Sequence, residues 1–170
     1  WLRATAGDFV DSTALRIVLP APTSSPLWSA TTWSDVAPSG FNNQWFSYCA
    51  VDAAGLLSCG GGAPTSMGTT PLRSFSNGYR QACGLAADST AHCVGSNAVG
   101  EFGLGANGVI TTPSSNVLVA AAGNRKWRQL DVGDNRTVCG IQAADSVVHC
   151  WGLNDNGQVG RLPASRSAPE

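Results

Sequence analysis

The stretch that decides the fold is residues 139–160, which read CGIQAADSVVHCWGLNDNGQVG. Its two cysteines, Cys139 and Cys150, bracket two short apolar runs separated by the turn-forming pair Asp145 and Ser146. Apolar runs of this length on either side of such a centre are typical of a β-hairpin. In this hairpin the two cysteines would face each other about 5.5 Å apart, which is within the reach of a disulfide.

The same pattern occurs twice more upstream. Residues 48–59 read YCAVDAAGLLSC and residues 82–93 read ACGLAADSTAHC. The six cysteines therefore fall into three similar pairs, which are Cys49 with Cys59, Cys83 with Cys93, and Cys139 with Cys150. Three local disulfides are the favoured interpretation, with bound metal and free buried thiols as the alternatives; zinc sites usually place cysteines only about two to four positions apart. Each bridge would remove about 2.7 kcal/mol of unfolded-chain entropy, and such bridges indicate an oxidising, extracellular compartment.

Composition narrows the class further. The chain has 170 residues, of which 43% are hydrophobic and 12% charged, with 20 glycines and 9 prolines. This balance favours a turn-rich all-β chain over a disordered or helical one. The formal net charge of -1 predicts no nucleic-acid partner. The longest apolar run, residues 117–122, is far shorter than the roughly 20 residues that span a bilayer, so no membrane insertion is expected. The sequence opens at Trp1 rather than Met, and its ends need not be natural termini.

The similarity between the units extends beyond cysteine. Residues 72–103 and 127–160 share a large apolar residue, a glycine six positions later (Gly78 and Gly133), Cys-Gly, His-Cys, and a Gly-x-Asn-x-x-Gly-x-x-Gly tail. The first unit begins at Trp33 and keeps both cysteines, but it lacks this tail. Glycines in the tail are expected where a Cβ would clash, and the tail asparagines are expected to bond within the turn.

The segment CWGLNDNGQVG, residues 150–160, resembles the signature of the regulator of chromosome condensation repeat family. The resemblance implies a β-propeller, usually with seven blades of four strands. The cysteine-bearing form is more similar to the extracellular branch, seen in the ectodomains of crinkly-type plant receptor kinases, than to the nuclear exchange factor. The chain is therefore predicted to be all-β, a partial β-propeller of about three blades, each with a disulfide-closed hairpin.

Three blades cannot close a seven-bladed ring, because an open arc leaves sheet edges and part of its core exposed. We therefore expect other protein subunits, or the remaining blades of the same polypeptide, as partners. The predicted division is the end of a preceding blade or a linker at 1–32, a degenerate first repeat at 33–71, a second at 72–126, a third at 127–160, and a connecting segment or tail at 161–170. The first repeat is degenerate because Cys49 and Cys83 are 34 positions apart, against 56 between Cys83 and Cys139.

Candidate functional residues are few. Trp45, in the insertion FNNQWFSY, is the speculative binding residue for a ligand or partner. Asn135 opens the tripeptide Asn-Arg-Thr, an N-glycosylation acceptor pattern, with chance occurrence as the alternative. His92 and His149 each precede a cysteine, and a position repeated in this way indicates packing rather than catalysis or metal binding. Three tryptophans stand at repeat positions, and they are Trp33, Trp127 and Trp151. We expect them to pack between neighbouring blades, with stacking on a sugar as the alternative.

Together these features favour a non-enzymatic extracellular module that mediates protein–protein or matrix interactions within a larger surface or secreted glycoprotein assembly. No catalytic residue, metal or cofactor is predicted. A secreted carbohydrate-binding or carbohydrate-active protein is the main alternative, because exposed Trp and Asp residues can contact sugars. A guanine nucleotide exchange factor, which the family resemblance implies, is less favoured because the cysteine pairs indicate an oxidising compartment.

Overall fold

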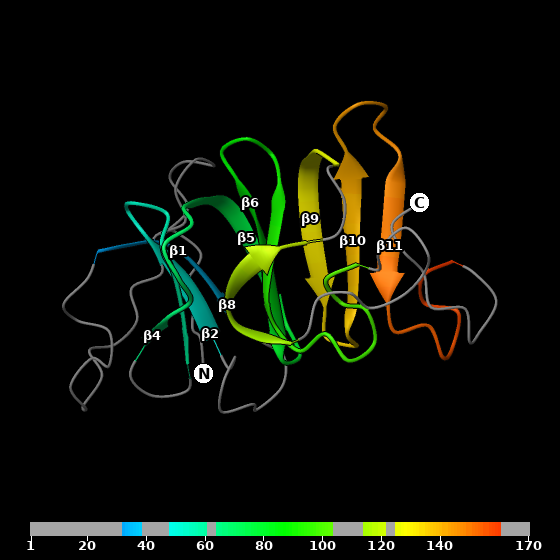
Figure 1. Ribbon diagram of the computed structural model, residues 1–170, viewed down its shortest axis with the longest axis horizontal. Helices are drawn as coiled ribbons and strands as arrows, with labels where there is room; N and C mark the ends of the chain where they lie inside the picture. Colours follow the sequence, from blue (N-terminus) through cyan, green and yellow to red (C-terminus); the bar gives the residue numbers. More distant parts are fainter. Residues whose placement is uncertain (1–31, 39–47, 61–63, 104–113, 122–124, 161–170) are drawn as a thin grey trace, which may run out of the picture.

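The computed structural model describes residues 32–38, 48–60, 64–103, 114–121 and 125–160. All eleven regular elements in these ranges are β-strands, and they form three antiparallel sheets that stand side by side (Figure 1). We call these sheets the first, second and third blades. The prediction of an all-β chain with about three blade-like sheets is therefore confirmed. Within the described ranges no helix is long and apolar enough to cross a membrane.

Each blade is a meander, because every strand pairs with strands that adjoin it in the sequence. The first blade contains β1 (Trp33–Pro38), β2 (Tyr48–Asp52), β3 (Leu57–Gly60) and β4 (Thr65–Ser66). The second contains β5 (Leu72–Gly78), β6 (Gln81–Ala86), β7 (Ala91–Gly95) and β8 (Ser115–Ala120). The third contains β9 (Trp127–Gly133), β10 (Thr137–Gln142) and β11 (Val148–Gly152). The short first unit still holds four strands because β4 has only two residues.

Disulfides close the central hairpin of every blade. Each pair of cysteines occupies facing positions in the register of β2 with β3, β6 with β7, or β10 with β11. The bonded pairs are those that the spacing predicts, namely Cys49–Cys59, Cys83–Cys93 and Cys139–Cys150. Their Cα atoms lie 4.1 Å apart. This is shorter than the expected 5.5 Å and nearer to the roughly 4.5 Å typical of facing residues that exchange no backbone hydrogen bonds.

The hairpin turns follow one design in all three blades. An aspartate side chain accepts a hydrogen bond from the backbone N–H two residues later, which holds the turn locally. These aspartates are Asp52, Asp88 and Asp145. Each turn also contains one residue with positive φ, and these are Gly55, Ser89 and Ser146. The turn predicted at Asp145 and Ser146 is confirmed, and its residue types tolerate this backbone.

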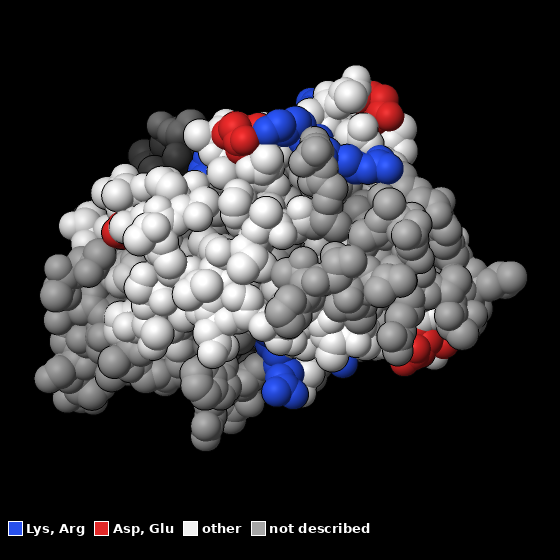
Figure 2. Space-filling model, in the orientation of Figure 1, with Lys and Arg blue, Asp and Glu red and all other residues white. Residues whose placement is uncertain are grey.

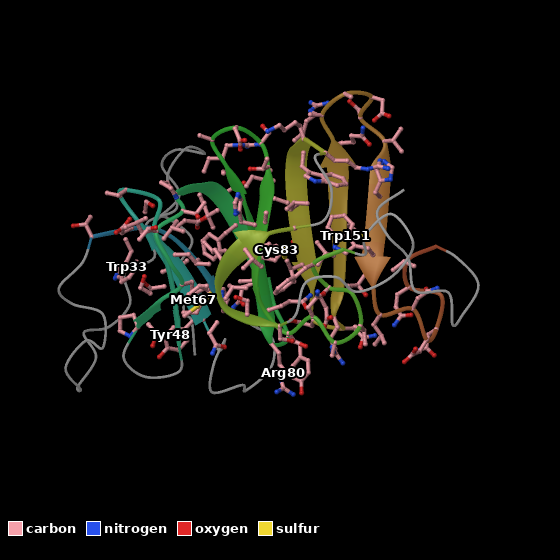
Figure 3. The ribbon with its side chains drawn as sticks, viewed as in Figure 1. Trp33, Tyr48, Met67, Arg80, Cys83 and Trp151 are labelled. Carbon is pink, nitrogen blue, oxygen red and sulfur yellow. A yellow bond between two sulfur atoms is a disulfide. The ribbon has the colours of Figure 1, made fainter. Side chains whose placement is uncertain are left out.

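Two apolar cores lie between the blades rather than within them. One joins the first and second blades, and the other joins the second and third. Trp127 and Trp151 are buried in the second core with ring centroids 5.2 Å apart, as expected for residues that wedge between blades. Trp33 is only half-buried, at the outer left of the array in Figure 3. Blade stacking is thus the main source of apolar burial.

Several predicted features lie outside the described residues. They include the candidate binding residue Trp45, residues 1–31 of the predicted preceding blade or linker, and the tail at 161–170. Within the predicted second repeat, 72–126, the last strand observed is β8. It forms the fourth strand of the second blade.

Candidate interaction surfaces

Every blade has one face that carries its disulfide, and we call this the cysteine face. In the first two blades this face is fully covered, because the next blade packs onto it. The cysteine face of the second blade, for example, shares a core with Trp127 and Val132 of the third blade. The four cysteines of the first two blades are accordingly at most 1% exposed. The cysteine face is therefore a docking surface for a neighbouring sheet.

The cysteine face of the third blade is not covered in this way. It presents Cys139, Ile141, Val148 and Cys150, which match Cys83, Leu85, Ala91 and Cys93 of the second blade in strand register. Val148 is 63% exposed, whereas Ala91 is 4% exposed. The third disulfide is half-buried, unlike the other two. The cysteine face is thus buried in the first and second blades but exposed to solvent in the third.

A polar groove of about 700 Å³ runs between the first strands of the blades. Its walls are β1, β5 and β9, each of which is the edge strand of its sheet. Ser76 donates a hydrogen bond to Asp131 Oδ1 (2.7 Å) and accepts one from the backbone N–H of Val132 (3.0 Å). The groove therefore brings three sheet edges together, and side chains of β5 bond to the edge of β9.

Two further side chains of β5 bond to edge carbonyl groups in the same groove. Arg73 Nη2 donates to the carbonyl oxygen of Trp127 at 3.1 Å, and Asn77 Nδ2 donates to that of Ala37 at 3.3 Å. Exposed edge strands are prone to unwanted pairing, and side chains that occupy their polar groups reduce that tendency. Much of the polarity of the groove therefore has a structural use.

Basic residues gather at one end of the second and third blades. Arg125 donates to Gln142, Arg128 donates to Ser146, and Lys126 forms an exposed ion pair with Asp88 at 2.8 Å. Figure 2 shows Lys and Arg beside Asp and Glu at the upper end of the visible face. Hydrogen bonds from Lys126 and Thr90 hold the pKa of the Asp88 carboxyl well below its usual range. The cluster is thus internally paired.

A buried ion pair joins the second and third blades at their other end. Glu101 is fully buried, and its Oε1 lies 2.7 Å from Arg136 Nη2 and accepts from Arg136 Nε at 2.8 Å. Ser96 Oγ also donates to Oε1, and the backbone N–H of Val99 donates to Oε2. The carbonyl oxygen of Glu101 accepts from Trp151 Nε1 at 2.9 Å. We call this arrangement the inter-blade clamp.

Sequence reasoning did not identify the clamp, although the repeat contains a signal for it. Arg80 and Arg136 both stand three positions before the first cysteine of a hairpin, and both have positive φ. Glu101 and Gln158 likewise occupy the same position in the two Gly-x-Asn tails. Polar residues that recur at matched positions indicate a common contact, even when their partners are distant in sequence.

The Gly-x-Asn tails form matching loops beside the clamp. Asn97 and Asn154 are buried, and their side-chain oxygens accept from the backbone N–H groups of Phe102 and Val159. All six tail glycines have positive φ, as expected, and they are Gly95, Gly100, Gly103, Gly152, Gly157 and Gly160. At Gly152 a Cβ would lie 2.3 Å from the carbonyl oxygen of Arg136. The tail of the second blade thus places Glu101 beside Arg136.

The remaining candidate residues lie apart from one another. Asn135 is exposed in the turn between β9 and β10. Burial lowers the pKa of both His92 and His149. Thr90 Oγ1 is 3.2 Å from His92 Nε2, and the His149 ring packs edge-on against Trp127. Among the described residues no group of three or more His, Cys, Asp or Glu side chains is placed to hold a metal ion.

Comparison with known proteins identifies the architecture. No protein-family model and no curated protein matches the sequence. A chain in the crystal structure of Kap60 bound to yeast RCC1 (Prp20) matches with a TM-score of 0.61 and 14% identity, over 81% of this chain and 36% of that chain. The ectodomain of the Physcomitrella patens receptor kinase CR4 matches with a TM-score of 0.54 and 21% identity, over 82% and 35%.

Human WBSCR16 is similar in the same way, with a TM-score of 0.55 and 17% identity, over 76% of this chain and 38% of that chain. The present chain thus spans little more than a third of each of these structures. At such low identity the likeness establishes the fold alone. The three sheets are blades of an RCC1-like β-propeller.

Proposed function

We propose that the chain is a non-enzymatic extracellular interaction module, whose blades mediate protein–protein or matrix contacts within a larger assembly. The observation that carries this proposal is the open cysteine face of the third blade. The same face is covered by a neighbouring sheet in both other blades, so its surface chemistry is suited to another protein. A contiguous exposed apolar patch on a sheet commonly marks such a contact.

Three disulfides support the extracellular location. Bonds of this kind persist in oxidising compartments and are rare in the cytosol. The receptor ectodomain among the similar structures is consistent with this location. A glycan on Asn135 would fit the same compartment, since this side chain is exposed in a turn.

The use of the polar side chains supports a binding rather than a catalytic role. Ser76 and Asn77 of the groove bond to neighbouring blades, and the histidine position recurs in the second and third blades. A repeated position generally serves the repeat itself, whereas a catalytic group is needed once. We therefore expect replacement of His92 or His149 by Gln to change only the stability of the protein.

An apolar dye provides a direct test of the docking face. The chain would be produced by secretion, and binding of anilinonaphthalene sulfonate would be compared in the parent protein, Val148→Asp and Val117→Asp. Val117 is a matched control because it is 50% exposed on β8, away from the cysteine face of the third blade. We expect the signal to fall only in Val148→Asp. Equal signals in all three proteins would refute the proposed docking face.

Carbohydrate binding is the second candidate, and the polar groove is the observation that favours it. Gln129 and Asp131 are exposed along its wall and offer hydrogen-bonding groups to hydroxyls. The test is titration with β-linked glucose, N-acetylglucosamine and mannose oligosaccharides. Binding that is lost in Gln129→Ala but kept in Asn116→Ala, an exposed control on β8, would support it. Absence of binding across the panel would reject it.

A further inference from the structure

We propose that the open cysteine face of the third blade docks the first blade of a second copy of this chain, head to tail. The proposal deepens the proposed function, on which it rests, by naming the partner. Three lines of evidence support it: the repeated packing of blade on blade, the matching exposure at the two ends of the array, and the polar chemistry beside the open face.

The first line is the continuity of the blade interface. Leu72 and Phe75 of β5 pack onto the cysteine face of the first blade, and Trp127 and Leu130 of β9 pack onto that of the second. We call the side of each blade that lies opposite its own cysteine face the leading face. One interface is thus built twice from the same strand positions, and the third cysteine face presents those positions again.

The second line is that the leading face of the first blade is exposed along its edge strand, β1, although Ala50 on β2 is buried. Val36 faces Ala50 in the strand register, as Phe75 faces Gly84 and Leu130 faces Gly140. Phe75 and Leu130 pack against a core, but Val36 is 64% exposed. Three of the four exposed large hydrophobic residues in the described part of the chain lie at the two ends of the array, and they are Val36, Val147 and Val148.

The third line is the clamp position of the third blade, which is neutral. Gln158 Oε1 accepts from the backbone N–H of Asn156 at 2.8 Å, as Glu101 Oε2 accepts from Val99 at 2.8 Å. Gln158 Nε2 is buried and makes no hydrogen bond within the described residues. Leu153 stands where the second blade has Ser96. This site offers no carboxylate to an incoming arginine.

The neutral clamp selects among the blades of this chain. In the sequence, the residue three positions before the first cysteine is arginine in the second and third units but Phe46 in the first. A guanidinium buried against a neutral amide and a leucine would lose its hydration without gaining an ion pair. The first unit is thus the one that avoids this penalty, which favours a head-to-tail contact between copies.

The contact is heterologous, because different surfaces of the two copies meet. Such contacts build closed rings or open filaments, depending on the rotation between copies. They also allow complementation. Val148→Asp disables only the cysteine face of the third blade, and Val36→Asp disables only the leading face of the first. Each variant alone should remain monomeric, yet the two together should form a one-to-one dimer through their intact faces.

Sedimentation equilibrium of the full chain, between about 1 and 100 μM, tests this arrangement. We expect the parent protein and Val117→Asp to associate, each end variant alone to stay monomeric, and the equimolar mixture to dimerise. A parent protein that stays monomeric, or a mixture that fails to dimerise, would overturn the proposal. Far-ultraviolet circular dichroism and thermal melting would establish that both variants are folded, which is expected because both valines are largely exposed.

A substitution in the clamp provides an independent readout. Gln158→Glu should raise the dissociation constant of the parent association about tenfold, because it buries a carboxylate with no cation opposite it. Asn116→Asp, which adds the same charge at an exposed position on β8, should leave association unchanged, and equal effects of the two would count against the proposed docking. A monomeric parent protein whose dye signal still falls in Val148→Asp would overturn self-docking and leave the proposed function standing. A monomeric parent protein whose dye signal is unchanged in Val148→Asp would overturn both self-docking and the proposed function.

Discussion

Removal of the guanidinium at Arg136 should destabilise the protein by about 3 kcal/mol. The Glu101 side chain is fully buried, and after Arg136→Ala only Ser96 Oγ and the Val99 N–H remain to bond to its carboxylate. Breaking a buried ion pair on one side typically costs about 3–5 kcal/mol. The lower end applies, because the Arg136 side chain is 26% exposed and water can reach part of the vacated site.

Urea unfolding followed by tryptophan fluorescence would measure this loss. Arg80→Ala is the matched control, because Arg80 holds the same repeat position, also has positive φ, and is exposed. We expect it to cost less than about 0.5 kcal/mol, as for most surface substitutions. Equal effects of the two substitutions would refute the clamp as a stabilising contact.

A double-mutant cycle separates the ion pair from loss of packing. Adding Glu101→Gln to Arg136→Ala should restore part of the lost stability, because the amide removes the unpaired buried charge. Gln158 shows that a glutamine fits this loop with the same backbone hydrogen bond. Simple additivity of the two single substitutions would mean that the charges do not interact.

Three further predictions concern the third disulfide, a close contact between two blades, and the two histidines. The third disulfide, which is the half-buried one, should be reduced first by dithiothreitol, as followed by alkylation and mass spectrometry; random order would contradict the role of burial. Gly78→Ala should destabilise the protein by about 1–3 kcal/mol, because its Cβ would lie 2.7 Å from the carbonyl oxygen of Gly133, whereas Gly133→Ala finds its nearest atom at 3.5 Å and should cost little. Burial lowers the folded-state pKa of His92 and His149, so the unfolded chain binds more protons as the pH falls from about 7.5 to 5.5, and stability should decline over that range. Urea unfolding at both pH values measures this, and a slope that persists when both histidines are Gln would assign it elsewhere.

The hairpins could be predicted because their determinants are local. Cys139 and Cys150 are separated by one turn whose residues favour it, so strand, turn and disulfide follow from about a dozen positions. The blade count followed from repetition of this unit. The predicted repeat boundaries at residues 71 and 126 stay predictions, since strand positions alone do not mark where one repeat begins.

The groove and the clamp could not be derived in the same way. Glu101 and Arg136 are 35 positions apart, and only the stacking of two blades brings them together. The groove likewise exists because three edge strands converge, which no single strand pattern encodes. The repeats do share an arginine, and a Glu or Gln, at matched positions. This recurrence indicates a contact but does not predict its geometry.

The difference between Glu101 and Gln158 bears on which blade of one chain can dock on a blade of another. Each cysteine face has a disulfide and two apolar residues at matched register positions, so apolar packing by itself distinguishes the blades less than a buried charge does. Glu101, buried in the second blade, penalises any neighbour that lacks an arginine opposite it, because its charge would then be unpaired. Gln158 in the third blade penalises a neighbour that brings one. Specificity then comes from the free-energy cost of placing an unsuitable residue opposite Glu101 or Gln158. A few buried polar positions can thus determine which two blades pack together, while the apolar residues contribute affinity.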